Sequence, residues 1–334
     1  MIIQNSFSYR LSAEEQSLLA DILRCGNYNL VYVEHTKIAA ETADCRIALY
    51  KSGKCLVQGK GASDFVLFVL EPFVLRRTEF GYEDILNPEA FQPHMGVDES
   101  GKGDFFGPMV VASVYVDKSL VEAMRKMNVR DSKTISSEKK MLEIGSGLQK
   151  LLGNQYSIVK IGPQAYNRLY SQMRNVNSIL AWAHARAIEN LMEIVPHCPR
   201  AISDQFGSTK QVEGALMKKG RQIELIQQHR AESDPAVAAA SILARTAFVQ
   251  ALKKMEEKYE TSFPKGASAA VHEAGLKLIE KHNPTILLET AKCHFKTTDV
   301  ILKKLNKDRN ILGPEGQAVS KPVRQRHVKK SDVC

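Results

Sequence analysis

The sequence lacks the marks of several protein classes. Its six cysteines include no C-x-x-C pair, so it has no structural zinc pattern, and a chain of 334 residues does not need a disulfide framework. The longest apolar run, residues 65–75, is too short to cross a membrane and contains Glu71. The first residues, MIIQNSFSYRLSAEEQ, turn polar too soon for a secretory signal. We therefore expect a cytoplasmic protein that does not bind a membrane.

The composition is that of a soluble globular protein, with 44% hydrophobic and 25% charged residues. A chain of this length buries a large core and is expected to form more than one domain. The formal net charge of +9 favours a polyanionic partner. Charge alone does not identify that partner as nucleic acid, because many basic proteins bind none.

Residues 1–86 are predicted to form a small α+β domain. Ser12 and Glu15 make a capping box that begins a helix, with Gly26 as its stop signal. NYNLVYVE, CRIALYK and KCLVQGK read as strands, and Ser52-Gly53 between the last two reads as a hairpin turn. The apolar run that follows suits a buried helix, which Pro72 should end or kink.

The remainder reads as a linker, a larger α/β domain and a tail. Residues 87–94, NPEAFQPH, carry two prolines and weak periodicity and are taken as the linker. From residue 95 to residue 305 strands alternate with helices, which indicates an α/β layer structure. Its last long helix begins at Asp234-Pro235, and its small residues favour close packing on a strand. Residues 306–334 are basic and aperiodic and are predicted to be a disordered tail.

The stretch GVDESGKGDFFGP, residues 96–108, has the G-x-x-x-x-G-K spacing of a phosphate-binding loop. Gly103 stands where such a loop needs Ser or Thr, and the carboxylates of Asp98 and Glu99 inside it would repel a polyphosphate. We therefore predict no nucleotide cofactor. Adjacent carboxylates at a strand end, followed by glycines that permit close approach, instead suit a bound cation. A solvated acidic turn is the alternative.

Two further carboxylates follow predicted elements. Asp204 ends the apolar strand AISDQF, where it could equally cap the next turn. Glu232 precedes the Ala-rich helix, whose dipole alone would favour an acidic residue. Four such carboxylates would suit two divalent ions in phosphodiester hydrolysis, and oxygen ligands favour Mg²⁺ or Mn²⁺ over zinc. Spacing alone does not show that the four meet in space.

Four segments, in order, resemble the type 2 ribonuclease H family: GVDESGKGDFFGPMVVASV, VRDSKTIS, AISDQF and HRAESDPAVAAASILAR. The resemblance covers residues 92–305 as the catalytic domain. The HII branch typically has D-E-A-G-R-G in the first motif, where this chain has Lys102 in place of the Arg. It also typically has Asp at the fourth acidic position, where this chain has Glu232. Both departures, and the N-terminal extension, make the chain most similar to the HIII branch, in which the extension resembles a TATA-box-binding-protein-like module that grips the substrate.

The resemblance implies an endoribonuclease that cleaves the RNA strand of RNA–DNA hybrids with Mg²⁺ or Mn²⁺, leaving 5′-phosphate and 3′-hydroxyl ends. It implies a ribonuclease H-like mixed sheet flanked by helices, and we expect a monomer whose partner is the hybrid duplex. The metal-binding and catalytic residues would be Asp98, Glu99, Asp204 and Glu232. The substrate-binding residues, which would read RNA 2′-hydroxyls and contact phosphate, would be Ser100, Gly101, Lys102, Gly103 and Lys133.

Some alternatives stay open at this point. Lys133 could lie in a purely structural turn, and Asp104 could be a capping group. His184 could lie on a helix surface or be a core histidine with its hydrogen bonds satisfied. Three other functions compete with the reading above: ribonuclease HII activity at a single embedded ribonucleotide, hybrid binding without catalysis, and a nucleotidase built on the phosphate-like loop.

Overall fold

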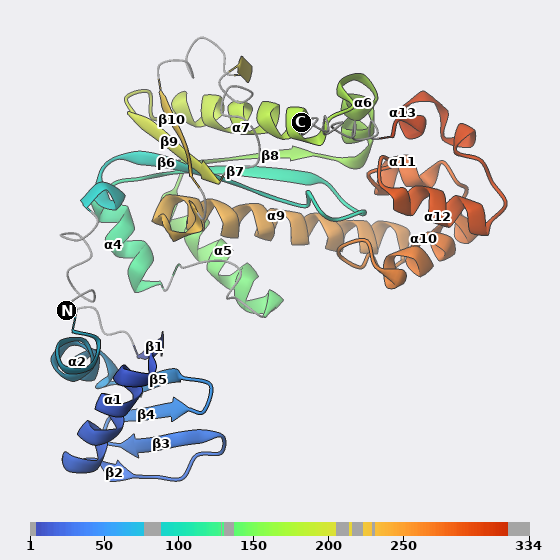
Figure 1. The fold of residues 1–334 in the computed structure, drawn as a ribbon. Coiled ribbons are helices and arrows are strands. Elements are labelled where there is room, and N and C mark those ends of the chain that lie inside the picture. The colour runs from blue at the N-terminus through green and yellow to red at the C-terminus, as the bar shows by residue number, and fades with distance from the viewer. Residues whose placement is uncertain are drawn as a thin grey trace, which may run out of the picture. The chain divides into compact units, whose positions relative to one another are not determined.

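The computed structural model describes residues 5–76, 88–127, 129, 137–204, 214–215, 223–228 and 231–319, with only the backbone described for Gln228 and Glu232. The chain divides into two compact units, Met1–Gln92 and Pro93–Cys334, which we describe separately (Figure 1). The division falls inside the predicted linker, residues 87–94. Within that stretch Pro88–Phe91 forms the 3-10 helix η2, and His94 already belongs to the first strand of the second unit.

The first unit is a five-stranded antiparallel sheet in the order β1-β5-β4-β3-β2. Its strands are β1 (Ser6–Arg10), β2 (Asn29–Leu30), β3 (Thr36–Glu41), β4 (Cys45–Tyr50) and β5 (Lys54–Gly59). Helices α1 (Ala13–Cys25), α2 (Ala62–Phe65) and η1 (Val66–Leu75) pack on one face of the sheet. The predicted capping box of Ser12 and Glu15 is present at the start of α1, and the predicted hairpin turn joins β4 to β5 with Gly53 at φ +82°.

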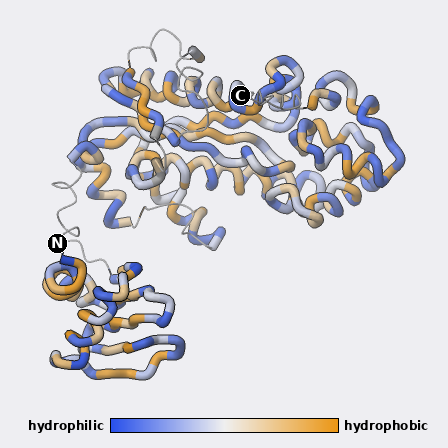
Figure 2. Tube along the Cα trace, viewed as in Figure 1, coloured by the Kyte–Doolittle hydropathy of each residue, from blue (hydrophilic) through white to orange (hydrophobic). Residues whose placement is uncertain are grey.

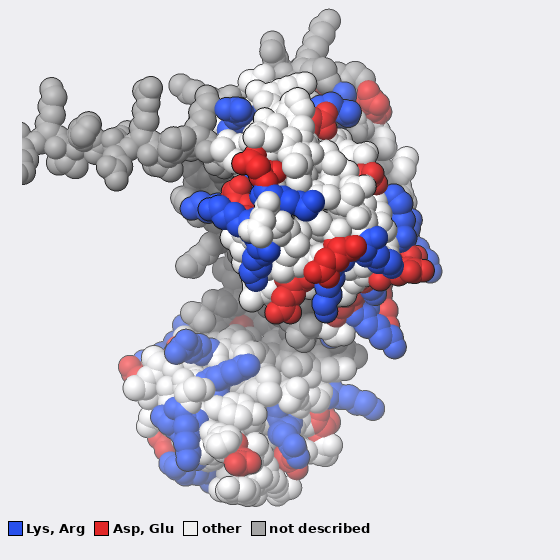
Figure 3. Space-filling model, turned by 90° about the vertical axis from the view of Figure 1, so that its right-hand side faces the viewer, with Lys and Arg blue, Asp and Glu red and all other residues white. Residues whose placement is uncertain are grey.

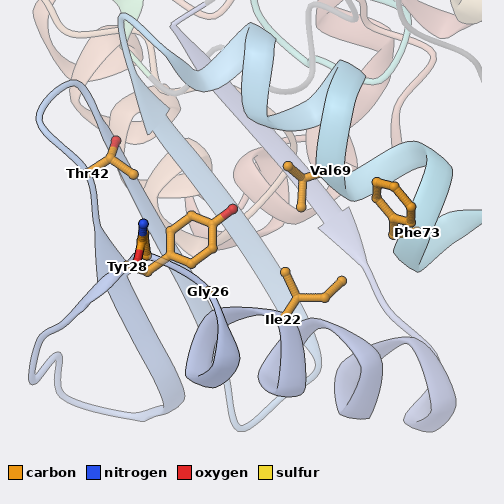
Figure 4. A pocket seen from close by; sticks show the side chains of 7 residues that line it. Ile22, Gly26, Tyr28, Thr42, Val69 and Phe73 are labelled. Carbon is orange, nitrogen blue, oxygen red and sulfur yellow. The ribbon is translucent and has the colours of Figure 1, made fainter.

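Two local predictions for this unit are corrected. The strand expected over residues 27–34 shrinks to the two residues of β2, while β1 and β3 were not predicted. Of the two effects predicted for Pro72, the early end is wrong: the helix continues as the π-helix η1 to Leu75, while a kink stays a prediction. This helix stands out as hydrophobic in Figure 2. Its Phe73, which is 62% exposed, helps to line a small apolar pocket with Ile22 and Tyr28 (Figure 4).

The second unit contains a five-stranded mixed sheet in the order β10-β9-β6-β7-β8. Its strands are β6 (His94–Ser100), β7 (Met109–Val116), β8 (Tyr156–Ile161), β9 (Arg200–Asp204) and β10 (Glu224–Gln228). β6, β9 and β10 are parallel to one another, and β7 pairs antiparallel with both of its neighbours, β6 and β8. The helix α7 (Val176–Met192) covers one face and α9 (Pro235–Tyr259) the other (Figure 1). The mixed sheet flanked by helices, as predicted, is confirmed.

Shorter helices complete this unit. They are α4 (Lys118–Lys126), α5 (Glu138–Leu152), α6 (Pro163–Met173), η5 (Ala231–Ser233), α10 (Ala269–Lys281), α11 (Ile286–Thr290), α12 (Lys296–Lys304), η6 (Arg309–Leu312) and α13 (Gly313–Gln317). The last two correct the prediction that residues 306–334 are a disordered tail. Arg309 donates to the backbone carbonyls of Cys293 and Gly316 and pairs with Asp299, which binds this segment to the domain. Residues 320–334 lie outside the described residues.

The helix α9 is the central helix of the second unit. It begins as predicted, with Pro235 in its first turn and the Asp234 side chain accepting hydrogen bonds from the backbone N–H groups of Ala236 and Val237. By length and composition α9 could span a membrane, but 78% of its most apolar window is buried inside this unit. It is therefore a core helix, packed on β6 and β7.

Candidate active site

The carboxyl ends of two parallel strands bring the first and third predicted carboxylates to neighbouring positions. β6 and β9 pair with Val97 opposite Ser203. Continuing this register by one residue along both strands places Asp98 level with Asp204, the last residue of β9. Parallel strands that end at the same edge of a sheet are a common location for ligand sites in α/β proteins.

Asp98 faces α9. The hydroxyl of Ser241 on that helix donates a hydrogen bond to its carboxylate. Burial, and after it the negative charge of Glu99, raise the pKa of Asp98 to about 6, and the hydrogen bond from Ser241 only partly offsets these two effects. Asp98 is thus a buried acid without enough positive charge around it to hold it ionised at low cost.

Glu99 has a different environment because successive residues of a strand point to opposite faces of the sheet. The Nε2–H of His184, on α7, donates to Glu99 Oε2 at 3.2 Å, and Lys102 Nζ lies 3.5 Å from Glu99 Oε1. Burial acts to raise the pKa of Glu99, but the hydrogen bond and charge of His184, followed by the charge of Lys102, outweigh it and lower the pKa. Glu99 is therefore held as a carboxylate beside a carboxyl group that ionises less readily.

The fourth predicted carboxylate, Glu232, lies on η5, between β10 and α9. The start of the following helix, α9, fixes the backbone position of Glu232. Asp234 caps α9, and its carboxylate also contacts Nε2 of the fully buried His94, the first residue of β6, at 3.0 Å. The start of α9 is thereby tied to the strand that carries Asp98 and Glu99. The side chain of Glu232 lies outside the described residues.

The predicted substrate-binding loop, residues 100–103, begins at Ser100, the last residue of β6. Gly101 has φ +88°, and a Cβ on it would lie 2.3 Å from the carbonyl oxygen of Pro108, so only glycine fits there. Gly103 is exposed, with no atom within 4 Å of the position of a Cβ. The side chain of Lys102 is 36% exposed. The loop thus has a fixed base at Gly101 and an accessible tip.

The structure brings only some of the predicted site residues together. Asp98, Glu99 and the 100–103 loop are contiguous, and Asp204 is on the neighbouring strand, whereas Lys133 falls outside the described residues. Among the side chains that the structure describes, no group of three or more His, Cys, Asp or Glu is close enough to hold a metal ion. The metal ligation predicted for the four carboxylates therefore stays a prediction.

Two hydrogen-bond partners of these carboxylates were not predicted from the sequence. Of the two readings of His184, the surface one is wrong and the core one is confirmed, but its hydrogen bond to Glu99 was not predicted. The hydrogen bond of Ser241 to Asp98 was not predicted either. A histidine among alanines on an apolar helix is the signal that could have raised the question for His184. Nothing in the sequence pairs either residue with a particular carboxylate.

Comparisons with known proteins identify the family. The sequence model of the ribonuclease HII family matches residues 95–298. The chain is 40% identical over 292 residues to ribonuclease HIII of Protochlamydia amoebophila, covering 87% of this chain and 95% of that protein. It is 38% identical over 300 residues to ribonuclease HIII of Chlamydia trachomatis serovar L2, covering 89% of this chain and 98% of that protein.

Solved structures give the same result. The crystal structure of Bst-RNase HIII in complex with Mn²⁺ has a TM-score of 0.62 and 25% sequence identity, covering 90% of this chain and 98% of that one. RNase H3 of Aquifex aeolicus has a TM-score of 0.50 and 26% identity, covering 86% and 98%. Since the family model, the relatives and these structures all extend over most of the chain, this protein belongs to the type 2 ribonuclease H family of hydrolases, in its ribonuclease HIII branch.

Proposed function

We propose that this protein is an endoribonuclease that hydrolyses the RNA strand of RNA–DNA hybrids with Mg²⁺ or Mn²⁺, leaving 5′-phosphate and 3′-hydroxyl ends. The observation that carries the proposal is the pair Asp98–Glu99, placed at the end of β6 beside Asp204 and directly before a glycine-rich loop. The relatives named ribonuclease HIII, and the related structure that was solved with Mn²⁺, support the reaction class and the metal.

The residues present fit a divalent cation. Asp98, Glu99, Asp204 and Glu232 offer only carboxylate oxygens, the ligands that Mg²⁺ and Mn²⁺ prefer. The raised pKa of Asp98, which burial and the charge of Glu99 cause, shows that negative charge there needs compensation. When bound by these carboxylates, divalent ions would activate a water and neutralise charge on the phosphate under attack.

The chain's own residues have distinct tasks in this proposal. His184 and Lys102 hydrogen-bond different oxygens of Glu99 and so fix the orientation of its carboxylate. Ser241 does the same for Asp98. The backbone of the 100–103 loop would contact the ribose, since the 2′-hydroxyl is what distinguishes RNA from DNA. Lys102, and Lys133 from its own motif, would contact phosphate.

We also propose that the first unit binds the hybrid. The face of its sheet opposite the helices carries exposed polar side chains from three strands, namely Ser8, Arg10, Arg46, Lys54 and Gln58. Figure 3 shows basic side chains spread over part of this unit. Acidic residues outnumber basic ones in residues 1–92 as a whole, so the positive net charge of the chain lies in the second unit. Binding of a polyanion should therefore weaken steeply with salt through contacts of the second unit above all.

A metal-titrated cleavage assay on four duplexes tests the proposal: a long hybrid, double-stranded RNA, double-stranded DNA, and DNA with one embedded ribonucleotide. We expect cleavage of the long hybrid only, dependent on Mg²⁺ or Mn²⁺ and lost in Glu99→Gln. Product ends are read by whether a ligase accepts them without prior phosphorylation. Strong incision at the single ribonucleotide would favour ribonuclease HII activity, and cleavage of double-stranded RNA but not of the hybrid would refute the proposal.

A further inference from the structure

Lys292 is the largest charged side chain that is completely buried among the described residues. It follows α11 in the segment between that helix and α12 (Figure 1). Burial lowers its pKa to about 7, although the negative charge of Asp104 acts in the opposite direction. Burying an ammonium group is costly unless its hydrogen bonds are made, so its partners show what the charge is used for.

The ammonium of Lys292 binds one short stretch of backbone. Nζ donates to the carbonyl oxygen of Gly107 at 2.7 Å and lies 3.3 Å and 3.5 Å from those of Phe106 and Pro108. Three successive carbonyls converge on it because Gly107 is in the left-handed region, at φ +80°. In its protonated form Lys292 donates charge-assisted hydrogen bonds, which are stronger than those between neutral groups. Lys292 is therefore a clamp on residues 106–108, which join the glycine-rich loop to β7.

Other bonds fasten the same stretch from two sides. Phe105 and Gly107 exchange backbone hydrogen bonds with the segment 290–292, with Lys292 N to Phe105 O at 2.8 Å and Gly107 N to Thr290 O at 2.9 Å. On the other side, Asp104 Oδ1 accepts from Gly266 N at 2.6 Å. The loop between β6 and β7 is thus held by segments far away in the sequence.

The contacts of Lys292 extend to the 100–103 loop through Pro108. The carbonyl oxygen of Pro108, one of the three acceptors of Lys292, is the atom nearest to where a Cβ on Gly101 would lie, and with the Phe248 ring it leaves no room for a side chain there. Asp98 and Glu99 are held differently, because β6 pairs them with Ala112 and Val111 of β7. Loss of Lys292 should therefore disturb the loop more than the carboxylates.

We propose that Lys292 is a positioning residue that holds the 100–103 loop in the shape needed to recognise the ribose of an RNA strand. This inference rests on the function proposed above for that loop. It makes recognition and chemistry separable: the clamp governs how well the enzyme selects RNA, while the carboxylates, anchored in the sheet, govern the rate of cleavage.

The test compares Lys292→Met, which keeps the length of the side chain but not its charge, with wild type on a long hybrid. We expect KM to rise about tenfold, as the loss of hydrogen bonds to a charged group implies, and kcat to fall less than about threefold. Binding measured by fluorescence anisotropy in EDTA should lose its preference for hybrid over the matched DNA duplex. Asp104→Ala, at a half-exposed position on the same loop, should show the same pattern and serves where Lys292→Met does not fold.

Leu148→Ala, which truncates a buried side chain of α5, is the control for a variant that only destabilises the fold. It should lower the active fraction and thus the apparent kcat, with KM and the preference for hybrid unchanged. The inference is overturned when Lys292→Met and Asp104→Ala behave like Leu148→Ala, or like wild type. Failure of the proposed function would look different, because wild type itself would then not cleave the hybrid.

Discussion

Gly96→Ala should be among the most damaging single-methyl changes in the second unit. Gly96 lies in β6 where α9 begins to pack on the strand, and an added Cβ would lie 2.1 Å from Ala236 C and from Val237 N. Both are backbone atoms, so no side-chain rotation can relieve the clash. To reach an ordinary contact of 3.4 Å the helix would have to move by about 1.3 Å, in an interior packed as tightly as a crystal.

The expected cost follows from that displacement. Overpacking a core costs about 1–3 kcal/mol, and a clash between two backbones belongs at the upper end, about 3 kcal/mol. For a domain of this size, that lowers the unfolding temperature by roughly 10 °C. Since α9 carries Ser241, and η5 with Glu232 precedes it, a shift of about 1 Å should also reduce cleavage by about 100-fold.

The matched control is Gly147→Ala in α5. There an added Cβ meets only the terminal methyl of Met127, which can move aside. Alanine is favoured over glycine inside a helix by about 1 kcal/mol, so this variant should be as stable as wild type or more so. Thermal unfolding and single-turnover cleavage of a hybrid are measured for all three proteins. A Gly96→Ala variant that unfolds and cleaves like wild type would refute the close packing of α9 on β6 at this glycine.

Substitutions at three other residues test the site. Asp98→Asn should abolish cleavage yet stabilise the metal-free protein by about 3 kcal/mol above pH 6. The pKa of the Asp98 carboxyl is raised from 3.8 to about 6 in the folded state, so the wild-type protein loses stability as pH rises through that window. Urea unfolding in EDTA should show the difference from wild type growing between pH 4 and 6, and a pH-independent difference would contradict it. His184→Ala should slow cleavage about 10- to 100-fold by releasing the Glu99 carboxylate, as loss of an orienting partner does, with His184→Gln retaining more activity in the same assay. Asp234→Ala should cost about 3 kcal/mol in urea unfolding, since it removes a helix cap and leaves buried His94 without its carboxylate; a cost below 1 kcal/mol would argue against that pair.

The sequence predicted what is encoded locally. The strand, glycine turn and strand around Asp98 and Glu99, the start of α9 at Asp234, and the capping box of the first unit all depend on neighbouring residues. The order of the four motifs then identified the family, which the comparisons confirmed. That identification brought in Asp204 and Glu232, which spacing alone had left open.

What the sequence could not predict depends on contacts between distant residues. His184 is 85 residues from Glu99, and Lys292 is 185 residues from Gly107, so no local pattern links either pair. The short helices at residues 309–317 are missed for the same reason. Arg309 ties them to the backbone carbonyls of Cys293 and Phe295, outside these helices, while their own sequence has no helical periodicity.

One pairing of elements accounts for both the fold and the site of the second unit. Along β6 and α9 the contacts occur in the same order. His94 meets Asp234, and Gly96 meets the Ala236–Val237 peptide. Further along, Asp98 meets Ser241, and Gly101 meets Phe248.

These contacts stay in step because the two elements cover the same distance. The seven residue steps from His94 to Gly101 span about 23 Å of strand, and the fourteen from Asp234 to Phe248 span about 21 Å of helix. The spacing within each of the two motifs is thus constrained by the other motif. A residue inserted into β6 or into α9 would shift every later contact between them. The positions of the glycines that pack against the helix and of the carboxylates in the site are therefore linked.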